Sequence, residues 1–140
     1  LLAHAAPRAA MAAFPIRLLA EGAERTSLPA QSFDSVVVTF TLCTIPDLEA
    51  ALAEMRRLVK PDGRLYFSEH GRAADTSVSR WQDRLNPLWN KIAGGCNLNR
   101  DIGKSIARAG FRIEEIDTGY IPGVPVKLAG FQYLGVAVPG

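Results

Sequence analysis

The spacing of apolar positions changes from segment to segment, and it predicts strands and helices in alternation. Nearly continuous apolar runs, several rich in β-branched residues, predict strands over 16–20, 33–42, 64–69, 111–117 and 131–138. Helical spacing or alanine-rich composition predicts helices over 1–14, 47–60, 78–92 and 100–109. This order favours an α/β fold with right-handed crossovers. The last two strands have no helix between them, so we expect them to pair antiparallel.

The helix expected over 47–60 carries its own start and stop signals. Asp47 is a plausible N-cap, and Lys60 places positive charge at the C-terminal end of the helix dipole. Pro61 stops the helix and Asp62-Gly63 turns the chain into the next strand. The apolar stripe consists of Leu48, Leu52, Met55 and Val59.

Pro7 interrupts the first helix and Pro87 disturbs the third, whose stripe consists of Val78, Trp81, Leu85, Leu88 and Ile92. Trp81 and Trp89 either cover an apolar pocket or, as we expect, fill the core. Polar or Gly/Pro-rich stretches predict loops over 25–32, 71–77, 94–99 and 118–130. Gly110 is well placed as the residue that follows the fourth helix.

Composition indicates an ordinary globular chain of one domain, 1–140. Apolar residues make up 48% and charged residues 21%, and the net charge of +2 gives no reason to expect nucleic acid or a membrane surface as partner. Cys43 and Cys96 lie far apart without metal-type spacing, so we expect free thiols, no metal and a reducing, cytoplasmic location. No apolar run is long enough to span a bilayer.

The run "FDSVVVTFTLCTIPDLEAALAEMRRLVKPDGRLYFSEH" resembles class I S-adenosylmethionine-dependent methyltransferases. Two segments, "FSEH" and "WQDRLNPLWNKIAGGCNLNR", are similar to thiol methyltransferases and their bacterial relatives. The ubiquinone/menaquinone C-methyltransferases are a more distant likeness. The resemblance implies a Rossmann-like, mostly parallel sheet with an antiparallel C-terminal strand, and S-adenosylmethionine as cofactor.

The chain departs from the family pattern at its beginning. Members start with a strand, a glycine-rich loop and a second strand ending in an acidic residue, and none of these is present here. We therefore expect a partial methyltransferase domain that lacks the first two strands. Its open sheet would need a cover, from a missing N-terminal segment or from a second copy of the chain.

Cofactor contacts are implied by the resemblance at two places. Gly22 and Ala23 stand where family members bracket the adenine ring; the alternative is an ordinary strand-ending turn. Thr39, Phe40 and Thr41 end the strand at the carboxyl rim of the sheet, where ligands bind in open α/β folds. The alternative for Thr39 and Phe40 is core packing.

Glu69 and His70 end the next strand at the same rim, and the resemblance implies that they face the acceptor. His70 could take a proton as the methyl group arrives; alternatively, both residues only hold the loop by hydrogen bonds. Cys43, Cys96 and Asn97 are candidate acceptor-side residues. The alternatives are that the cysteines are buried and that Asn97, or Asn99, caps the next helix.

These expectations combine into a methyltransferase acting on a small, fairly apolar thiol, quinone or amine, truncated or degenerate at its cofactor end. The main alternative is a non-catalytic methyltransferase-fold protein that binds a partner. A hydride-transferring enzyme is a third possibility, but the chain has no Gly-x-Gly-x-x-Gly fingerprint.

Overall fold

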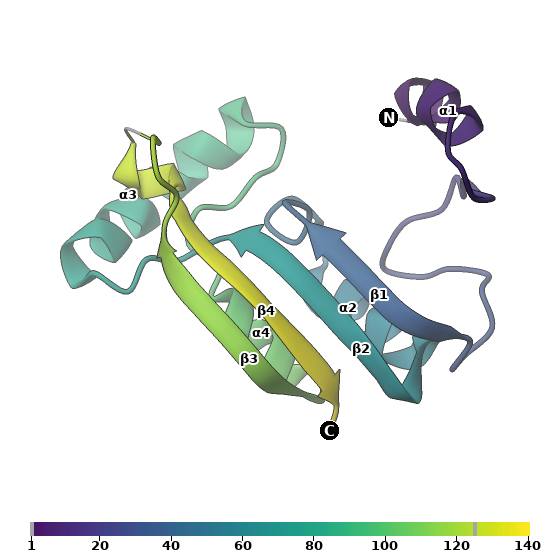
Figure 1. Cartoon of the computed structure of the whole chain (residues 1–140). Helices are drawn as coiled ribbons and strands as arrows, with labels where there is room; N and C mark the ends of the chain where they lie inside the picture. Colours follow the sequence, from purple (N-terminus) through teal and green to yellow (C-terminus); the bar gives the residue numbers. More distant parts are fainter. Residues whose placement is uncertain (1, 125) are drawn as a thin grey trace.

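The protein is built around a four-stranded mixed sheet in the order β1-β2-β4-β3 (Figure 1). The computed structural model describes residues 2–124 and 126–140. β1 and β2 run parallel, and β4 is antiparallel to both of its neighbours, so three strands share one direction. This confirms the predicted sheet with one reversed C-terminal strand. The elements are α1 (Leu2–Ala10), β1 (Phe33–Thr39), α2 (Leu48–Leu58), β2 (Val59–His70), α3 (Thr76–Ile92), α4 (Ile102–Arg108), β3 (Phe111–Tyr120), the 3₁₀ turn η1 (Lys127–Ala129) and β4 (Phe131–Pro139).

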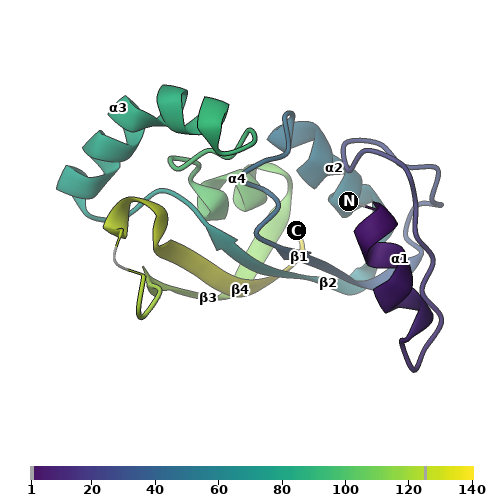
Figure 2. The same cartoon turned by 90° about the horizontal axis from the view of Figure 1, so that it is seen from above.

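The helices α2, α3 and α4 lie on one side of the sheet (Figure 2). α2 packs on β1 and β2, and α4 packs on β3 and β4. The core is the layer between them, and it includes Leu52, Leu65, Phe67, Ile102 and Ile106, each at most 2% exposed. Successive side chains of each strand point to opposite faces of the sheet, and those on this face form the core.

The opposite face of the sheet is bare over the residues that the structure describes. Alternate strand residues point to it and are exposed: Val37 at 65%, Tyr66 at 39%, Ile116 at 46% and Leu134 at 52%. The nearly continuous apolar run over 33–42 is typical of a strand covered on both faces, but one face of β1 is exposed among the described residues. Its apolar residues fit a two-sided cover, but α2 and α4 supply only one side.

The strand expected over 16–20 does not form, and these residues are coil. A strand needs a neighbour that pairs with its N–H and C=O groups, and none is present for this segment among the described residues. The following loop is instead fixed to α2, where Glu54 Oε1 accepts hydrogen bonds from the backbone N and Oγ1 of Thr26, at 2.9 and 2.6 Å. Of the first helix, residue 1 lies outside the described residues.

The helix-to-strand connection differs from its prediction in length. Asp47 caps α2 as expected, accepting the N–H of Ala50 at 3.0 Å, but the helix ends at Leu58 and β2 begins at Val59. Residues 60–63 bulge opposite a single residue of β1, Asp34. Lys60 therefore does not end the helix; its Nζ lies 2.6 Å from Asp34 Oδ1.

Helix α3 forms with Pro87 inside it, but three residues of its apolar stripe, Trp81, Leu88 and Ile92, are exposed, and only Val78 packs against the core. Trp81 is 54% exposed and Leu88 62%, so the expectation that Trp81 fills the core is wrong; Trp89 is half-buried. The inward face carries fully buried Gln82, whose side chain bonds Gly71 O at 3.1 Å, Ala73 N at 2.9 Å and Leu128 O at 2.8 Å. This polar network and the contact of Val78 with the core hold the helix in place.

The end of α4 follows its prediction, because Gly110 adopts a positive φ of 85° directly after the helix. Its beginning does not: Asp101 caps the helix by accepting the N–H of Lys104 at 3.1 Å, so neither Asn97 nor Asn99 is the cap. β3 runs three residues further than expected, to Tyr120. Within 2–124 and 126–140, no helix has the length and apolar character to cross a membrane.

Candidate functional site

The carboxyl ends of β1 and β2 meet at one rim of the sheet, where most of the predicted site residues gather. β1 ends at Thr39, and Phe40 follows with a positive φ of 47°, unusual for an aromatic residue. Its N–H donates to Ser68 O at 2.9 Å, and its half-exposed ring stacks on His70 with centroids 6.3 Å apart. Residues held in this backbone region cluster at ligand-binding sites.

Glu69 lies behind this rim and is fully buried. Its carboxylate accepts the N–H of Thr41 at 2.8 and 3.0 Å. Burial raises the pKa of Glu69, while hydrogen bonds from the backbone of Thr41, Leu42 and Cys43 act in the opposite direction. The carboxylate is thus directed at the loop after β1, an arrangement that favours the loop-holding alternative for Glu69 over contact with an acceptor.

His70 lies close to both cysteines and directly follows Glu69 at the end of β2. Its Nε2 lies 3.2 Å from Cys96 Sγ, and one ligand atom each of Cys43, His70 and Cys96 lie within 4.8 Å of one another. Burial raises the pKa of the Cys43 thiol to about 11 and lowers the pKa of His70. At neutral pH the Cys43 thiol is therefore protonated, and the imidazole favours its neutral form.

Asn97 fastens the loop after α3 to this cluster. Its backbone N and its Nδ2 both donate to Cys43 O, at 2.8 and 3.0 Å. Its Oδ1 accepts from Asn86 Nδ2 at 3.1 Å and from Asn90 Nδ2 at 3.3 Å. With these bonds Asn97 fixes the position of Cys96, its neighbour in sequence.

Arg100 completes the support of the rim and was not anticipated from the sequence. Its half-buried guanidinium donates to the carbonyl oxygens of Leu42 and of Ile45, the latter at 2.7 Å, with Pro46 O at 3.5 Å. Gln82 was missed as well. The side chains of Arg100 and Gln82 donate hydrogen bonds to backbone carbonyls of distant segments, and no local sequence pattern predicts such bonds.

The fold thus brings together Thr39, Phe40, Thr41, Cys43, Glu69, His70, Cys96 and Asn97. Gly22 and Ala23 lie on the separate coil that precedes Thr26 and packs beside α2. Cys43 is buried and Cys96 half-buried, and both are free thiols, as expected. The roles assigned to these residues from the sequence stay predictions.

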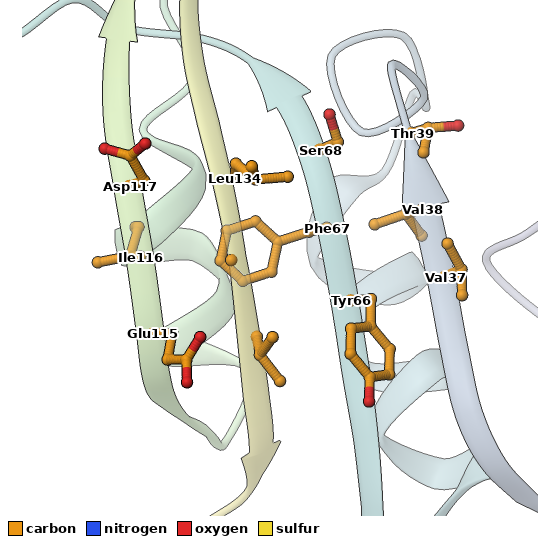
Figure 3. Close-up of a pocket in the computed structure, with 12 residues that line it drawn as sticks. Val37, Val38, Thr39, Tyr66, Phe67, Ser68, Glu115, Ile116, Asp117 and Leu134 are labelled. Atoms are coloured by element: carbon orange, nitrogen blue, oxygen red, sulfur yellow. The ribbon is translucent and has the colours of Figure 1, made fainter.

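A hollow of about 540 Å³ lies on the bare face of the sheet, below the rim (Figure 3). All four strands line it, with Val37, Tyr66, Ile116 and Leu134 among its apolar side chains. It ends at Thr39 and Ser68, next to the rim. Its shape is that of an uncovered sheet surface, and its polar lining residues are Thr39, Ser68, Glu115 and Asp117.

Comparison with known proteins agrees with this arrangement. Residues 1–67 match the family described as "Methyltransferase domain". Human thiol S-methyltransferase TMT1A is 42% identical over 82 residues, which are 57% of this chain and 33% of that protein. Both matches are to methyltransferases, and they agree with the resemblance of the sequence motifs to class I S-adenosylmethionine-dependent methyltransferases.

The chain is also similar to two further methyltransferases, the second of which shows the fold alone. The ubiquinone/menaquinone C-methyltransferase UbiE of Cupriavidus necator is 36% identical over 88 residues, 60% of this chain and 36% of that one. The crystal structure of a SAM-dependent methyltransferase from Methanosarcina mazei shares the fold, with a TM-score of 0.71 at 16% identity over 96% of this chain and 75% of that one. This chain spans about a third of the length of the curated relatives it matches.

Proposed function

We propose that this chain supplies the acceptor side of a methyltransferase that moves a methyl group from S-adenosylmethionine to a small thiol. The observation that carries the proposal is the rim cluster of His70, Cys43 and Cys96, which lies where open α/β sheets bind ligands. Its support in the comparisons is the identity with thiol S-methyltransferases, 42% for the human protein. A quinone acceptor has weaker support, 36% identity with UbiE.

In this proposal the rim after β1 contacts the cofactor. Thr39 and Thr41 offer hydroxyl groups and Phe40 offers a half-exposed ring, held by the positive φ of its backbone. Gly22 and Ala23 would contact the cofactor only if their coil moves to the rim, so we expect them to contribute less to cofactor binding. The glycine-rich loop of the family is absent from this sequence, and a further segment or a second copy of the chain would supply the cover.

His70 and Glu69 have different roles in this scheme. The neutral imidazole of His70 accepts the proton of the thiol as its sulfur approaches the methyl carbon. Glu69 is a positioning residue, because it holds the loop that carries Thr41 and Cys43. In-line alignment is the main requirement, because the sulfonium of the cofactor is already activated.

Calorimetric titration with S-adenosylhomocysteine tests the cofactor site. We expect micromolar binding to the 140-residue chain and weaker binding to Thr39→Val, while Thr118→Val, an exposed threonine of β3, binds like the parent. A folded chain that binds no S-adenosylhomocysteine would contradict the proposal and support a non-catalytic, partner-binding role. Equal affinity of Thr39→Val and the parent would mean that the pocket is placed wrongly.

Turnover of a small alkyl thiol with S-adenosylmethionine tests the acceptor side. We expect His70→Ala to lower turnover by about 10²-fold or more, the usual contribution of a positioned acid or base, while S-adenosylhomocysteine affinity changes little. Unchanged turnover would remove His70 from the mechanism. A quinone or an amine that reacts faster than the thiol would replace the proposed acceptor.

A further inference from the structure

The two cysteines and the rim histidine form a three-residue cluster from three separate segments. Cys43 comes from the loop after β1, His70 from the end of β2, and Cys96 from the loop after α3. Their ligand atoms lie within 4.8 Å of one another, with 3.2 Å between His70 Nε2 and Cys96 Sγ. Tetrahedral zinc with its usual bond lengths needs ligand atoms about 3.5–3.8 Å apart, so sub-ångström to ångström shifts suffice.

The surroundings hold these three side chains in place from different directions. Asn97 bonds to Cys43 O through two donors, which joins the Cys43 loop to the Cys96 loop. Glu69 holds the loop that carries Cys43 from behind, and Arg100 holds the same loop at Leu42 O and Ile45 O. Such outer contacts fix the ligands of metal sites.

The imidazole is free for a ligand. His70 Nδ1 is buried and has no hydrogen-bond partner among the residues that the structure describes, and the contact of Nε2 is to a cysteine sulfur. Among the described residues, no carboxylate or backbone carbonyl competes for Nε2, the ring nitrogen next to Cys96.

We infer that Cys43, His70 and Cys96 bind one zinc ion, and that the fourth coordination position of this ion takes the sulfur of the acceptor thiol. Two sulfurs and one imidazole are ligands that zinc prefers, and three protein ligands with one open position are typical of catalytic zinc sites. Cys96 and His70 are half-buried, so the site is reached from solvent.

The acceptor half of this inference rests on the proposed function. Cys43 and Cys96 release their thiol protons to solvent when they bind the ion, and an acceptor R–SH that takes the fourth position releases its proton in the same way and stays as thiolate. Its sulfur forms the new bond to the methyl carbon, and the bond from that carbon to the cofactor sulfonium breaks with its electron pair left on S-adenosylhomocysteine. No oxidant or reductant is needed. His70 is the proton acceptor described above in the zinc-free protein; where zinc is bound, the ion promotes loss of the thiol proton to solvent and His70 serves as a ligand.

Cobalt(II) titration of the reduced, metal-free 140-residue chain tests the metal half without cofactor or turnover. We expect one ion per chain, with a sulfur-to-cobalt charge-transfer band that zinc displaces. Cys96→Ala and His70→Gln should each weaken binding by more than about 100-fold, since even outer-shell partners are worth about 10–100-fold. His4→Gln, the matched histidine on α1, should bind like the parent.

Circular dichroism of each variant separates loss of a ligand from loss of the fold. A chain that shows no charge-transfer band, or folded Cys96→Ala and His70→Gln variants that bind as the parent does, would overturn the site. Ethanethiol added to the cobalt form should change the visible bands; unchanged bands would overturn the acceptor role. Failure of S-adenosylhomocysteine binding with the cobalt site intact would instead refute the proposed methyl transfer.

Discussion

Glu69 accepts the backbone N–H of Thr41 with both carboxylate oxygens, at 2.8 and 3.0 Å, from a fully buried position. One side chain of β2 thereby fixes the loop after β1, and with it Phe40 and Cys43. This explains why Glu69 and His70 follow each other in sequence: the first holds the rim from inside, and the second faces it.

Glu69→Gln should therefore destabilise the protein. The substitution places an amide NH₂ where two acceptor oxygens meet backbone N–H groups, and we expect a loss of about 1–3 kcal/mol in the free energy of unfolding. Urea denaturation measures it. Glu115→Gln, an exposed carboxylate of β3, is the control and should change stability little; equal effects of the two variants would refute a special role for Glu69.

Arg100→Lys tests the second support of the rim. The guanidinium reaches the carbonyls of Leu42 and Ile45 together, and a lysine ammonium cannot reproduce that fork. We expect a loss of about 1–2 kcal/mol, measured by urea denaturation. Arg108→Lys, on the exposed end of α4, keeps its charge in water and should have no measurable effect. An Arg100→Lys chain as stable as the parent would show that the fork is dispensable.

The stability of the chain should fall in acid partly through Glu54. Hydrogen bonds from Arg57, and also from Thr26, lower the pKa of Glu54 from 4.5 to about 2. Because the folded pKa lies below the unfolded one, the stabilisation is complete above about pH 5 and is lost as the pH falls toward 2.

Glu54→Gln removes this contribution, which is on the order of 2 kcal/mol at neutral pH. Urea denaturation at pH 6 and pH 3 measures the stability difference between parent and variant, which should be smaller at pH 3. Glu49→Gln on the same helix is the exposed control. A difference that does not change with pH would mean that Glu54 titrates normally in the folded chain.

Gly135 is required by the close approach of Phe67 and β3. A Cβ at this position would lie 2.6 Å from Phe67 Cζ and would also meet Glu115 O. We expect Gly135→Ala to cost about 1–3 kcal/mol or more in thermal or urea unfolding. Gly119→Ala is the matched control, because a Cβ there meets nothing within 4 Å. Two alanine variants of equal stability would contradict this crowding.

The sequence predicted those elements whose signals are local. Asp47 as N-cap, Gly110 after α4 and the antiparallel last two strands follow from a cap, a turn residue and a missing crossover. The exposure of Trp81, Leu88 and Ile92 on α3 could not be predicted, because Gln82 bonds backbone groups of distant segments that no helical periodicity reveals. The strand expected over 16–20 failed because strand formation depends on a neighbour rather than on composition.

The candidate site shows the same division. The position of His70 and Glu69 at the rim could be predicted because they end a strand, while their roles stay predictions. The approach of Cys43 to Cys96 could not, because 52 residues separate them and the loops that join them are held by Asn97 and Arg100. Metal-type spacing in a sequence reveals ligands that are close along the chain, whereas the three proposed ligands come from two loops and one strand end.

The bare face of the sheet has a practical consequence for anyone who handles the isolated chain. A continuous apolar surface lies beside β1, an edge strand of the described sheet, and consists of Val37, Tyr66, Ile116 and Leu134. Self-association through this surface, rather than unfolding, will then limit experiments. Light scattering should rise with protein concentration, and a hydrophobic dye should bind to the folded chain. Dilute samples or a mild detergent should keep the chain dispersed while the rim remains accessible.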